Sequence, residues 1–475
     1  MLGLKNTLRN AASGMNTSQA GLATVGHNLA NADTDGYSRQ QVHIGNRGPL
    51  RIISGSQQIS QAGQGATVQN IQRAHSTFLE RQLLRDRMER GFFQEQSQGL
   101  KLFERLFDDQ ASNTIGPAVD EFFNAARDLS QEPHRFGNRQ MFMLSADNIA
   151  RSFNEFAQQA HSVREDADRT VQANVERINE LAEIITATNA RIGTIEAVGI
   201  TANDFRDQRD IAIKEIAELA DVRVLIHRDG GAQIDLANGF SLVQGSNRAV
   251  LSTIPDPANA GLLAIEHTSL SGVTTEITNS IQTGEIGGLL NLRDTVIPTH
   301  MGEMDQLAFT FVAEVNAIHQ AGVGLDGLGG RDLFDPIGAV AGASLSISVN
   351  QAIEADPGLI AAAIDPAALP GDNRNLLALA DLQTAPHAVL TNVTFNHFYS
   401  EIIRSVGAGV NRSEQLSEFH QTRFEQSDSL RESIEGVSID DEMVDLSRFQ
   451  KHFEASARVM DTVNRLMDEL MQLVR

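Results

Sequence analysis

The two ends of this chain carry the same hydrophobic pattern, and that pattern limits how the chain can fold. At each end, apolar residues recur at alternating three- and four-residue steps, broken only at Ser18 and at Ser456. A repeat that averages 3.5 residues stays on one side of a helix only if the helix winds around a partner. We therefore predict a coiled-coil helix at each end. The seam residues are Met1, Leu4, Leu8, Ala11, Met15, Leu22, Val25 and Leu29 at the N-terminus, and Leu446, Phe449, Phe453, Met460, Val463, Met467, Leu470 and Val474 at the C-terminus.

The partner of each seam could be the other end of the chain or the same end of a neighbouring copy. An apolar heptad in one isolated helix usually indicates an intramolecular core. Chain ends commonly fray, however, so two long seams that reach both termini also suggest assembly between copies. The pattern alone leaves both interpretations open.

Composition restricts the classes of partner. A net charge of −23 disfavours nucleic acid and anionic membranes, because phosphate binding needs clusters of Lys and Arg. The chain has no Cys, so it contains no disulfide and no thiolate metal site. No apolar run of about 20 residues predicts membrane insertion. The polar N-terminal residues also do not form a cleavable secretory signal, so any export must use another route.

The order of secondary-structure signals predicts a mainly α chain with a small β domain. It comprises terminal coiled-coil helices, a long helical rod domain and an inserted β-rich outer domain. We expect a terminal domain formed by 1–33 and 438–475, a rod domain formed by 34–220 and 285–437, and a β domain at 221–284. This nesting should bring both chain ends to one pole and place the β domain at the other.

Several local predictions follow from the periodicity. Short strands are expected at 42–44 and 66–71, as part of a hairpin-like excursion. A helix over 138–197, with one slip of the seam near Val171, would span about 90 Å at 1.5 Å per residue. The pattern is again helical over 373–434. Ser438 followed by Asp441 is typical of a capped helix start.

The turn after the first seam carries a recognisable motif. From Asn28 to Arg39 the chain reads NLANADTDGYSR, which resembles the rod, hook and hook-associated family of bacterial flagellar axial proteins. The stretches 229–245, 284–294, 371–383 and 436–474 resemble the hook-associated members of that family. The motif residues are Asn28, Asn31, Thr34, Gly36, Tyr37 and Arg39.

The resemblance implies a structural subunit at the junction between the flagellar hook and filament. It implies export in unfolded form through the flagellar type III apparatus, with a chaperone bound at the C-terminal region. The implied partners are copies of the chain itself, the hook protein and hook-associated protein 3, and the implied location is extracellular. The resemblance also favours the seams as subunit interfaces. Larger family members carry an extra outer domain where this chain has only a short Gly/Ala/Pro-rich segment at 335–370, so we expect that domain to be absent.

Two local motifs suggest ligand chemistry but have simpler explanations. Gly322, Gly324 and Gly327 spell GxGxxG, but a dinucleotide site needs a strand before the glycines and here a helix precedes them. Residues 321–329 also approximate one calcium-binding nonapeptide, and a single copy cannot stack into a β-roll. We interpret this segment as a turn.

His27, Asp33, Asp35 and His43 bring metal-capable groups close in sequence, without a recognised ligand spacing. The Asp and Asn side chains of this turn are already needed for capping. The sequence offers no catalytic constellation, no cofactor site and no metal site, so we do not expect an enzyme. Two alternatives remain: a hook or rod paralogue, or a secreted ligand-binding or enzymatic protein carried on an axial scaffold.

Overall fold

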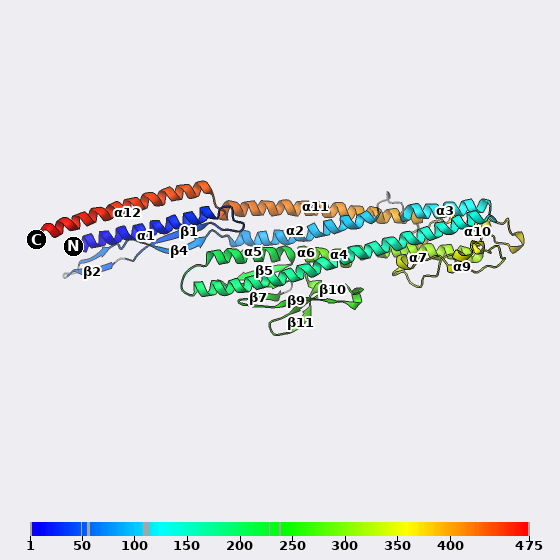
Figure 1. Ribbon diagram of the computed structural model, residues 1–475, viewed down its shortest axis with the longest axis horizontal. Coiled ribbons are helices and arrows are strands. Elements are labelled where there is room, and N and C mark those ends of the chain that lie inside the picture. Colours follow the sequence, from blue (N-terminus) through cyan, green and yellow to red (C-terminus); the bar gives the residue numbers. More distant parts are fainter. Residues whose placement is uncertain are drawn as a thin grey trace.

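The computed structural model describes residues 2–48, 50–54, 58–107, 114–227, 229–236 and 239–473. The molecule is an elongated rod (Figure 1). Both chain ends lie at one pole, as the nesting predicts, and α3, α10 and the start of α4 form the other pole. The helices and strands between these poles follow the predicted mainly α pattern with a small β region.

The helices carry most of the chain. They are α1 (Leu2–Ala30), α2 (Thr77–Glu104), α3 (Ile115–Gln131), α4 (Phe136–Glu196), α5 (Asn203–Leu219), α6 (Gly284–Asn291), α7 (Ile297–Ala321), α8 (Ala343–Ser346), α9 (Gln351–Ala355), α10 (Arg374–Asp381), α11 (Phe395–Glu435) and α12 (Ile439–Leu473). A short π-helix, Leu292–Val296, joins α6 to α7.

The strands in the described part of the chain form four antiparallel sheets. They are β1 (Gln40–Asn46), β2 (Leu50–Ser54), β3 (Gln58–Ala62), β4 (Ala66–Arg73), β5 (Val222–Ile226), β6 (Ala232–Leu236), β7 (Phe240–Gln244), β8 (Asn247–Arg248), β9 (Val250–Pro255), β10 (Leu263–Thr268) and β11 (Thr274–Glu276). The strand orders are β1-β4, β2-β3, β5-β6-β7-β8 and β11-β10-β9. The predicted strands 42–44 and 66–71 are confirmed as parts of β1 and β4, which pair from Gln40↔Arg73 to Asn46↔Ala66 with a bulge after His43.

The long helix α4 runs along much of the rod (Figure 1). Its predicted extent is confirmed to within two residues at each end. Its buried seam passes through Ile149 and Phe153, slips at Val171 and resumes at Ile178 and Ile185, all five of which are fully buried. The two halves of this seam serve two different cores. The first half contacts an aromatic core near the far pole, and the second half contacts an aliphatic core shared with α5 and the sheets.

The aromatic core includes phenylalanines of α3, α4, α7 and α11 and of the loop after α7. The ring of Phe122 lies 5.1 Å from that of Phe142 and 5.2 Å from that of Phe311, between ring centroids. The rings of Phe334 and Phe395 also pack against the Phe311 ring, at 5.7 Å and 5.4 Å between centroids. Edge-to-face and tilted packing of this kind is typical of buried aromatic clusters. It gives the far pole a dense interior.

The structure corrects the predicted position of the β domain. Strands β5 to β11 lie beside the middle of the rod and not at the pole opposite the chain ends (Figure 1). The reason is the direction of α4, which runs back from the far pole for 61 residues before α5 and β5 begin. The β domain therefore starts near the middle of the molecule.

The predicted helix over 373–434 is also wrong in its middle. Residues 382–394 separate α10 from α11, and Thr391 and Asn392 adopt positive φ angles of 60° and 61°. An α-helix cannot continue through two residues in the left-handed region. The hydroxyl of Thr394 then accepts a hydrogen bond from the backbone N–H of His397 at 3.3 Å and caps α11.

Candidate functional site: the terminal helix pair and its neck

The first and last helices pack against each other along their length in antiparallel directions (Figure 1). A Cβ atom placed on Gly14 would lie 2.7 Å from Ser456 Oγ, and one on Gly21 would lie 2.5 Å from the Phe449 ring. Farther along, Asn28 Nδ2 donates a hydrogen bond to Glu442 Oε2 at 3.0 Å. The residue numbers of each pair add up to 470. A single antiparallel register therefore runs through the pair.

The predicted seam residues that the structure describes fall into buried, partly exposed and exposed groups. Val25 and Val463 are each only 4% exposed, so the single chain already buries them. Leu29 and Leu470 remain 39% and 40% exposed. Val474 lies outside the described residues. The other predicted interface residues are partly exposed: Leu4, Leu8, Met15, Leu22, Leu446, Phe449, Phe453, Met460 and Met467.

The sequence interpretation missed the glycines that make this pairing close. Gly14, Gly21 and Asn28 are seven residues apart, on one stripe of α1, and they face Ser456, Phe449 and Glu442 in turn. Small residues at heptad spacing let two helix backbones approach, and this spacing was visible in the sequence. An apolar-only search does not find it, because glycine does not count as a seam residue.

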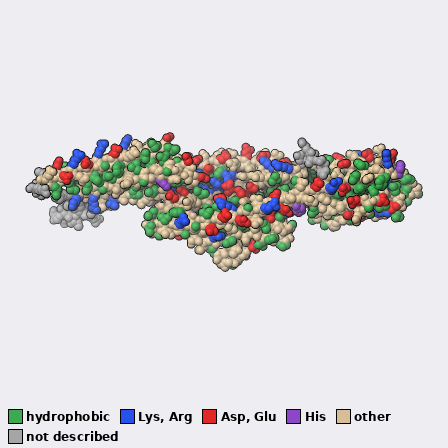
Figure 2. Space-filling view, viewed as in Figure 1, with side chains coloured by type: hydrophobic (Ala, Val, Ile, Leu, Met, Phe, Trp, Pro, Cys, Tyr) green, Lys and Arg blue, Asp and Glu red, His purple; other side chains and the backbone are tan. Residues whose placement is uncertain are grey.

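Pairing with α1 does not use all of the apolar surface of α12. Val444 is 68% exposed, Met471 66%, and Met443, Val459 and Leu466 are also exposed. On α1, by contrast, the β1–β4 hairpin covers a second face, and the Ala66 backbone N–H donates to Ser13 Oγ at 3.2 Å. The uncovered apolar surface of the terminal pair is therefore concentrated on α12, where Figure 2 shows hydrophobic side chains gathered.

A buried polar cluster, which we call the neck, joins the terminal pair to the rod. Its centre is Asn28, whose side chain is almost completely buried. Asn28 Nδ2 donates to the Gln40 carbonyl at 2.9 Å and to Glu442. Asn28 Oδ1 accepts from Tyr37 OH at 2.8 Å and from the Gln40 N–H at 2.9 Å. These four bonds satisfy every donor and acceptor position of the amide.

The neck also contains an ion pair between Arg39 and Glu442. Arg39 Nε donates to Glu442 Oε1 at 2.6 Å, and its Nη2 lies 3.3 Å from Asp445 Oδ2. The Glu442 side chain is 1% exposed and stands in the first turn of α12, where the helix dipole favours a negative charge. Loss of one partner of such a buried pair leaves an uncompensated charge, which is strongly destabilising. Arg39 and Glu442 therefore hold the start of α12 against the motif turn.

The remaining motif residues shape that turn. Gly36 has a φ of 74°, and a Cβ there would lie 2.5 Å from Ile211. Asn31 Nδ2 donates to the His27 carbonyl at 2.9 Å, and Thr34 Oγ1 donates to Asn31 Oδ1 at 3.3 Å. The motif thus ends α1 and redirects the chain.

The Tyr37 phenol stays protonated in the neck. Burial raises the pKa of Tyr37 well above its ordinary value, and the nearby carboxylates of Asp204, Asp207 and Glu442 raise it further. The hydroxyl therefore remains a hydrogen-bond donor to Asn28.

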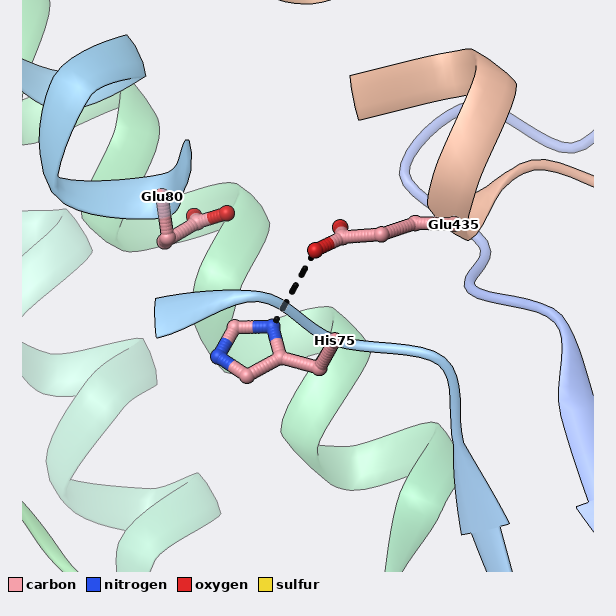
Figure 3. A group of neighbouring side chains, drawn as sticks. All are labelled: His75, Glu80 and Glu435. Atoms are coloured by element: carbon pink, nitrogen blue, oxygen red, sulfur yellow. Dashed lines mark ion pairs between the residues drawn. The ribbon is translucent and has the colours of Figure 1, made fainter. Parts of the chain in front are cut away.

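A second titratable cluster lies where α11 ends and α2 begins. Figure 3 shows His75, Glu80 and Glu435 directed toward one another, with His75 Nδ1 3.7 Å from Glu435 Oε1. In the part of the chain that the structure describes, this is the one group with metal-ligand proximity. Both carboxylates already have partners, because Glu435 Oε1 accepts from the Ser76 N–H at 2.6 Å and Glu80 lies 3.4 Å from Lys214 Nζ. The cluster therefore serves as an ion-pair tie between α2, α5 and α11.

The sequence interpretation did not find this cluster, because Glu435 is 360 residues from His75. The histidines and aspartates weighed there as metal ligands are not gathered into such a group. His27 Nε2 instead lies 3.4 Å from Asp204 Oδ1 and its ring packs edge-on against Tyr37. The glycines at 322, 324 and 327 lie in a turn that follows α7, and Gly327 has a φ of 77°.

No helix in the described ranges is both long enough and apolar enough to cross a membrane.

Three family models match the chain in order. Residues 8–37 match the flagella basal body rod protein family, residues 100–334 match the helical domain of flagellar hook-associated protein FlgK, and residues 432–473 match the C-terminal region of flagellar basal body rod FlgEFG proteins. The first and last matches cover the two paired helices and most of the motif turn. The middle match covers much of the rod and strands β5 to β11.

Similar proteins extend this likeness over the whole chain. Flagellar hook-associated protein 1 of Bacillus subtilis is 24% identical over 494 residues, which span 98% of this chain and 97% of the relative. The protein of the same name from Escherichia coli is 23% identical, over 99% of this chain and 100% of the relative. The fold resembles that of the flagellar hook junction protein FlgK from Burkholderia pseudomallei, with a TM-score of 0.67 and 15% identity over 75% of this chain and 100% of that chain. The ordered family matches and the nearly full-length relatives together show that this chain belongs to the flagellar hook-associated protein 1 family.

Proposed function

We propose that this chain is a structural subunit at the junction between the flagellar hook and filament, and that the α1–α12 pair is the element through which copies assemble. The observation that carries the second part is the apolar surface left on α12 after it has paired with α1. Val444, Val459, Leu466 and Met471 are exposed although α12 is already half of a helix pair. Contiguous exposed apolar surface on a folded chain marks an interaction site.

The interface includes both the predicted seam and the outer surface of α12. The partly exposed seam residues form its inner edge, Leu29 and Leu470 lie at its ends, and the four exposed α12 residues form its outer edge. In this assignment Val25 and Val463 stabilise the pair within one chain. Each predicted domain then has its own role. Assembly uses the terminal domain (1–33 and 438–475), torque passes along the rod domain (34–220 and 285–437), and the β domain (221–284) faces outward.

The names of the relatives, flagellar hook-associated protein 1 and flagellar hook junction protein, support a location at the hook. The specific partners are those that the resemblance of the sequence implies. They are neighbouring copies, the hook protein on one side and hook-associated protein 3 on the other, with a chaperone at the C-terminal region before type III export. The mature location is the extracellular hook–filament junction. The role is mechanical and non-enzymatic: long helices pass torque from the hook to the filament.

Substitution of seam residues tests the assembly role. Phe453→Asp and Leu470→Asp each place a charge on the apolar surface of α12, so both variants should keep a folded β domain but lose incorporation into flagella. Leu328→Asp is the matched control, because Leu328 is a similarly exposed apolar residue in the loop after α7, far from the terminal pair. Normal incorporation of both α12 variants would contradict the proposal.

Labelling of the chain in assembled flagella tests the location. A label confined to a band between hook and filament supports the junction. A label along the hook or within the rod would instead identify a hook or rod paralogue.

A further inference from the structure

A cavity of about 590 Å³ lies between the start of α2, helix α5 and strand β5. We call it the shoulder groove, and we define it by Arg81 and Leu84 of α2, Ile213 of α5, and Leu225 and Ile226 of β5. Strand β5 is an edge strand of its four-stranded sheet, and its two groove residues are about half exposed. The shoulder groove therefore has aliphatic side chains beside an open sheet edge. Polar side chains also line it, among them Glu80 and Asp210, which are paired with Lys214 and Arg73.

The loop between α4 and α5 extends this apolar surface. Thr201 lines the groove, and the neighbouring residues Val198 and Ile200 are 74% and 62% exposed. Exposed aliphatic side chains of the α4–α5 loop thus lie close in sequence to a residue of the groove.

The groove also carries positive charge that the chain does not neutralise. Arg73 Nη1 lies 2.7 Å from Asp207 Oδ1, and Arg206 Nε lies 2.8 Å from Glu196 Oε1, so these two guanidinium groups are paired. The exposed Arg81 donates only to the Thr77 carbonyl of its own helix, and among the described residues it has no carboxylate partner. Arg223, by contrast, stands opposite Asp235 in the β5–β6 pair and interacts with the nearby Asp221 carboxylate. In a protein with a net charge of −23, the unpaired Arg81 beside the aliphatic side chains of the groove indicates an acidic and apolar occupant.

The start of α12 has the complementary character. Ile439, Met443 and Val444 are exposed, and so are Asp440 and Asp441, for which the described residues provide no cationic partner. Glu442 points the opposite way, into the neck. We call these five outward residues the α12 knob.

The two surfaces lie at a similar level along the rod but on different sides. Helix α12 begins on one long side, whereas β5 and the α4–α5 loop lie on the other (Figure 1). Hydrophobic side chains are visible at both places in Figure 2. Two rods that stand side by side in the same direction therefore bring the knob of one copy to the groove of the next.

We propose that the shoulder groove binds the α12 knob of a second copy of this chain. The contact is heterologous, so each copy offers a knob to one neighbour and a groove to the other, and a row of parallel rods results. The aliphatic side chains of the knob fill the groove, and the carboxylates of Asp440 and Asp441 face Arg81. The inference rests on the proposed function, because it takes the neighbouring subunit to be another copy.

Disulfide trapping tests the contact without background, because the chain has no cysteine. Val444→Cys combined with Leu225→Cys should give a ladder of cross-linked multimers when assembled flagella are mildly oxidised. The matched control combines Val444→Cys with Val389→Cys, since Val389 is also exposed but lies in the turn before α11. It should give no ladder.

The outcomes separate the contact from the proposed function. Absence of the wild-type chain from flagella would refute the function and the contact together. Presence of the wild-type chain, with normal assembly of the double-cysteine variant but no ladder, would overturn the contact alone.

Charge exchange decides the matter if the cysteine variant does not assemble. Arg81→Glu should lower incorporation about threefold, because an ion pair worth roughly 0.7 kcal/mol is lost. Adding Asp440→Arg and Asp441→Arg to that variant should restore incorporation, whereas the two Asp changes alone should lower it. Failure of the combined variant to recover would overturn the contact.

Discussion

The close approach of α1 and α12 makes Gly21→Ala a sharp test of the terminal pair. In an exposed helix position, Ala is more favourable than Gly by about 1 kcal/mol. At Gly21 the added methyl group would lie 2.5 to 2.7 Å from three carbon atoms of the Phe449 ring, well inside van der Waals contact. The substitution should therefore destabilise the pair although it improves the helix.

A second glycine in the same helix provides the control. A Cβ on Gly26 would meet no atom within 4 Å, so Gly26→Ala should stabilise α1 by the full propensity gain. Overpacking costs roughly 1–3 kcal/mol, which offsets or exceeds that gain at Gly21. The two variants should thus differ by about 2 kcal/mol in the free energy of opening the pair, or roughly thirtyfold in exchange rate.

Amide hydrogen exchange of the purified chain measures this difference. Backbone amides of α12 around Phe449 should exchange faster in Gly21→Ala than in wild type, and slower in Gly26→Ala. Phe449→Leu removes part of the ring that the new methyl group meets, so it should relieve the effect of Gly21→Ala in a double variant. If Gly21→Ala protects α12 as well as Gly26→Ala does, the close packing and the register described above are wrong.

Three further predictions concern the neck, the free ends and a buried acid. Asn28→Ala should lower the free energy of unfolding by about 2–4 kcal/mol in chemical unfolding, because it leaves buried partners such as Tyr37 OH without a hydrogen bond. Ala at the partly exposed Asn16 is the control and should be neutral. Equal unfolding midpoints for the two variants would contradict a stabilising role of the neck. In a verified monomer, amides over 464–470, beyond the buried Val463, should exchange faster than those around Phe449, because the outer end of α12 lacks its neighbours, and equal protection of the two regions would sink this idea. Burial, reinforced by the charges of two nearby glutamates, raises the pKa of Glu285 to about 7. A raised carboxyl pKa gives stability at low pH that is lost as the pH rises from about 4.5 to 7. Glu285→Gln should therefore be about 1–2 kcal/mol more stable than wild type at pH 8 in urea unfolding, after allowance for solvent screening. A difference between the two proteins that does not shrink toward pH 5 would refute this.

Local periodicity predicted the elements whose signal is contained in one stretch of chain. The limits of α4 and the positions of β1 and β4 follow from side-chain patterns a few residues long. The cap of α12 was equally local: the Asp441 N–H lies 3.4 Å from Ser438 Oγ. The helices and hairpins were therefore accessible without a structure.

The contacts that join distant segments were not accessible in this way. The bond between Asn28 and Glu442 spans 414 residues, and nothing in the neighbourhood of either residue identifies the other. The position of the β domain also depends on the direction of α4, which a one-dimensional pattern does not contain. At 391–392, two residues with positive φ interrupt a pattern that otherwise continues as helix.

The direction of the terminal pair has a mechanical consequence. Helix α1 enters the rod at its last residues and α12 leaves the rod at its first, so both helices are attached to the rod at the same end of the pair (Figure 1). If neighbouring subunits hold the free end of the pair, axial tension between them and the rod is therefore shared by the two helices, which bear the load side by side. It does not slide one helix past the other, so the single register through Gly14, Gly21 and Asn28 can persist while the rod is under load.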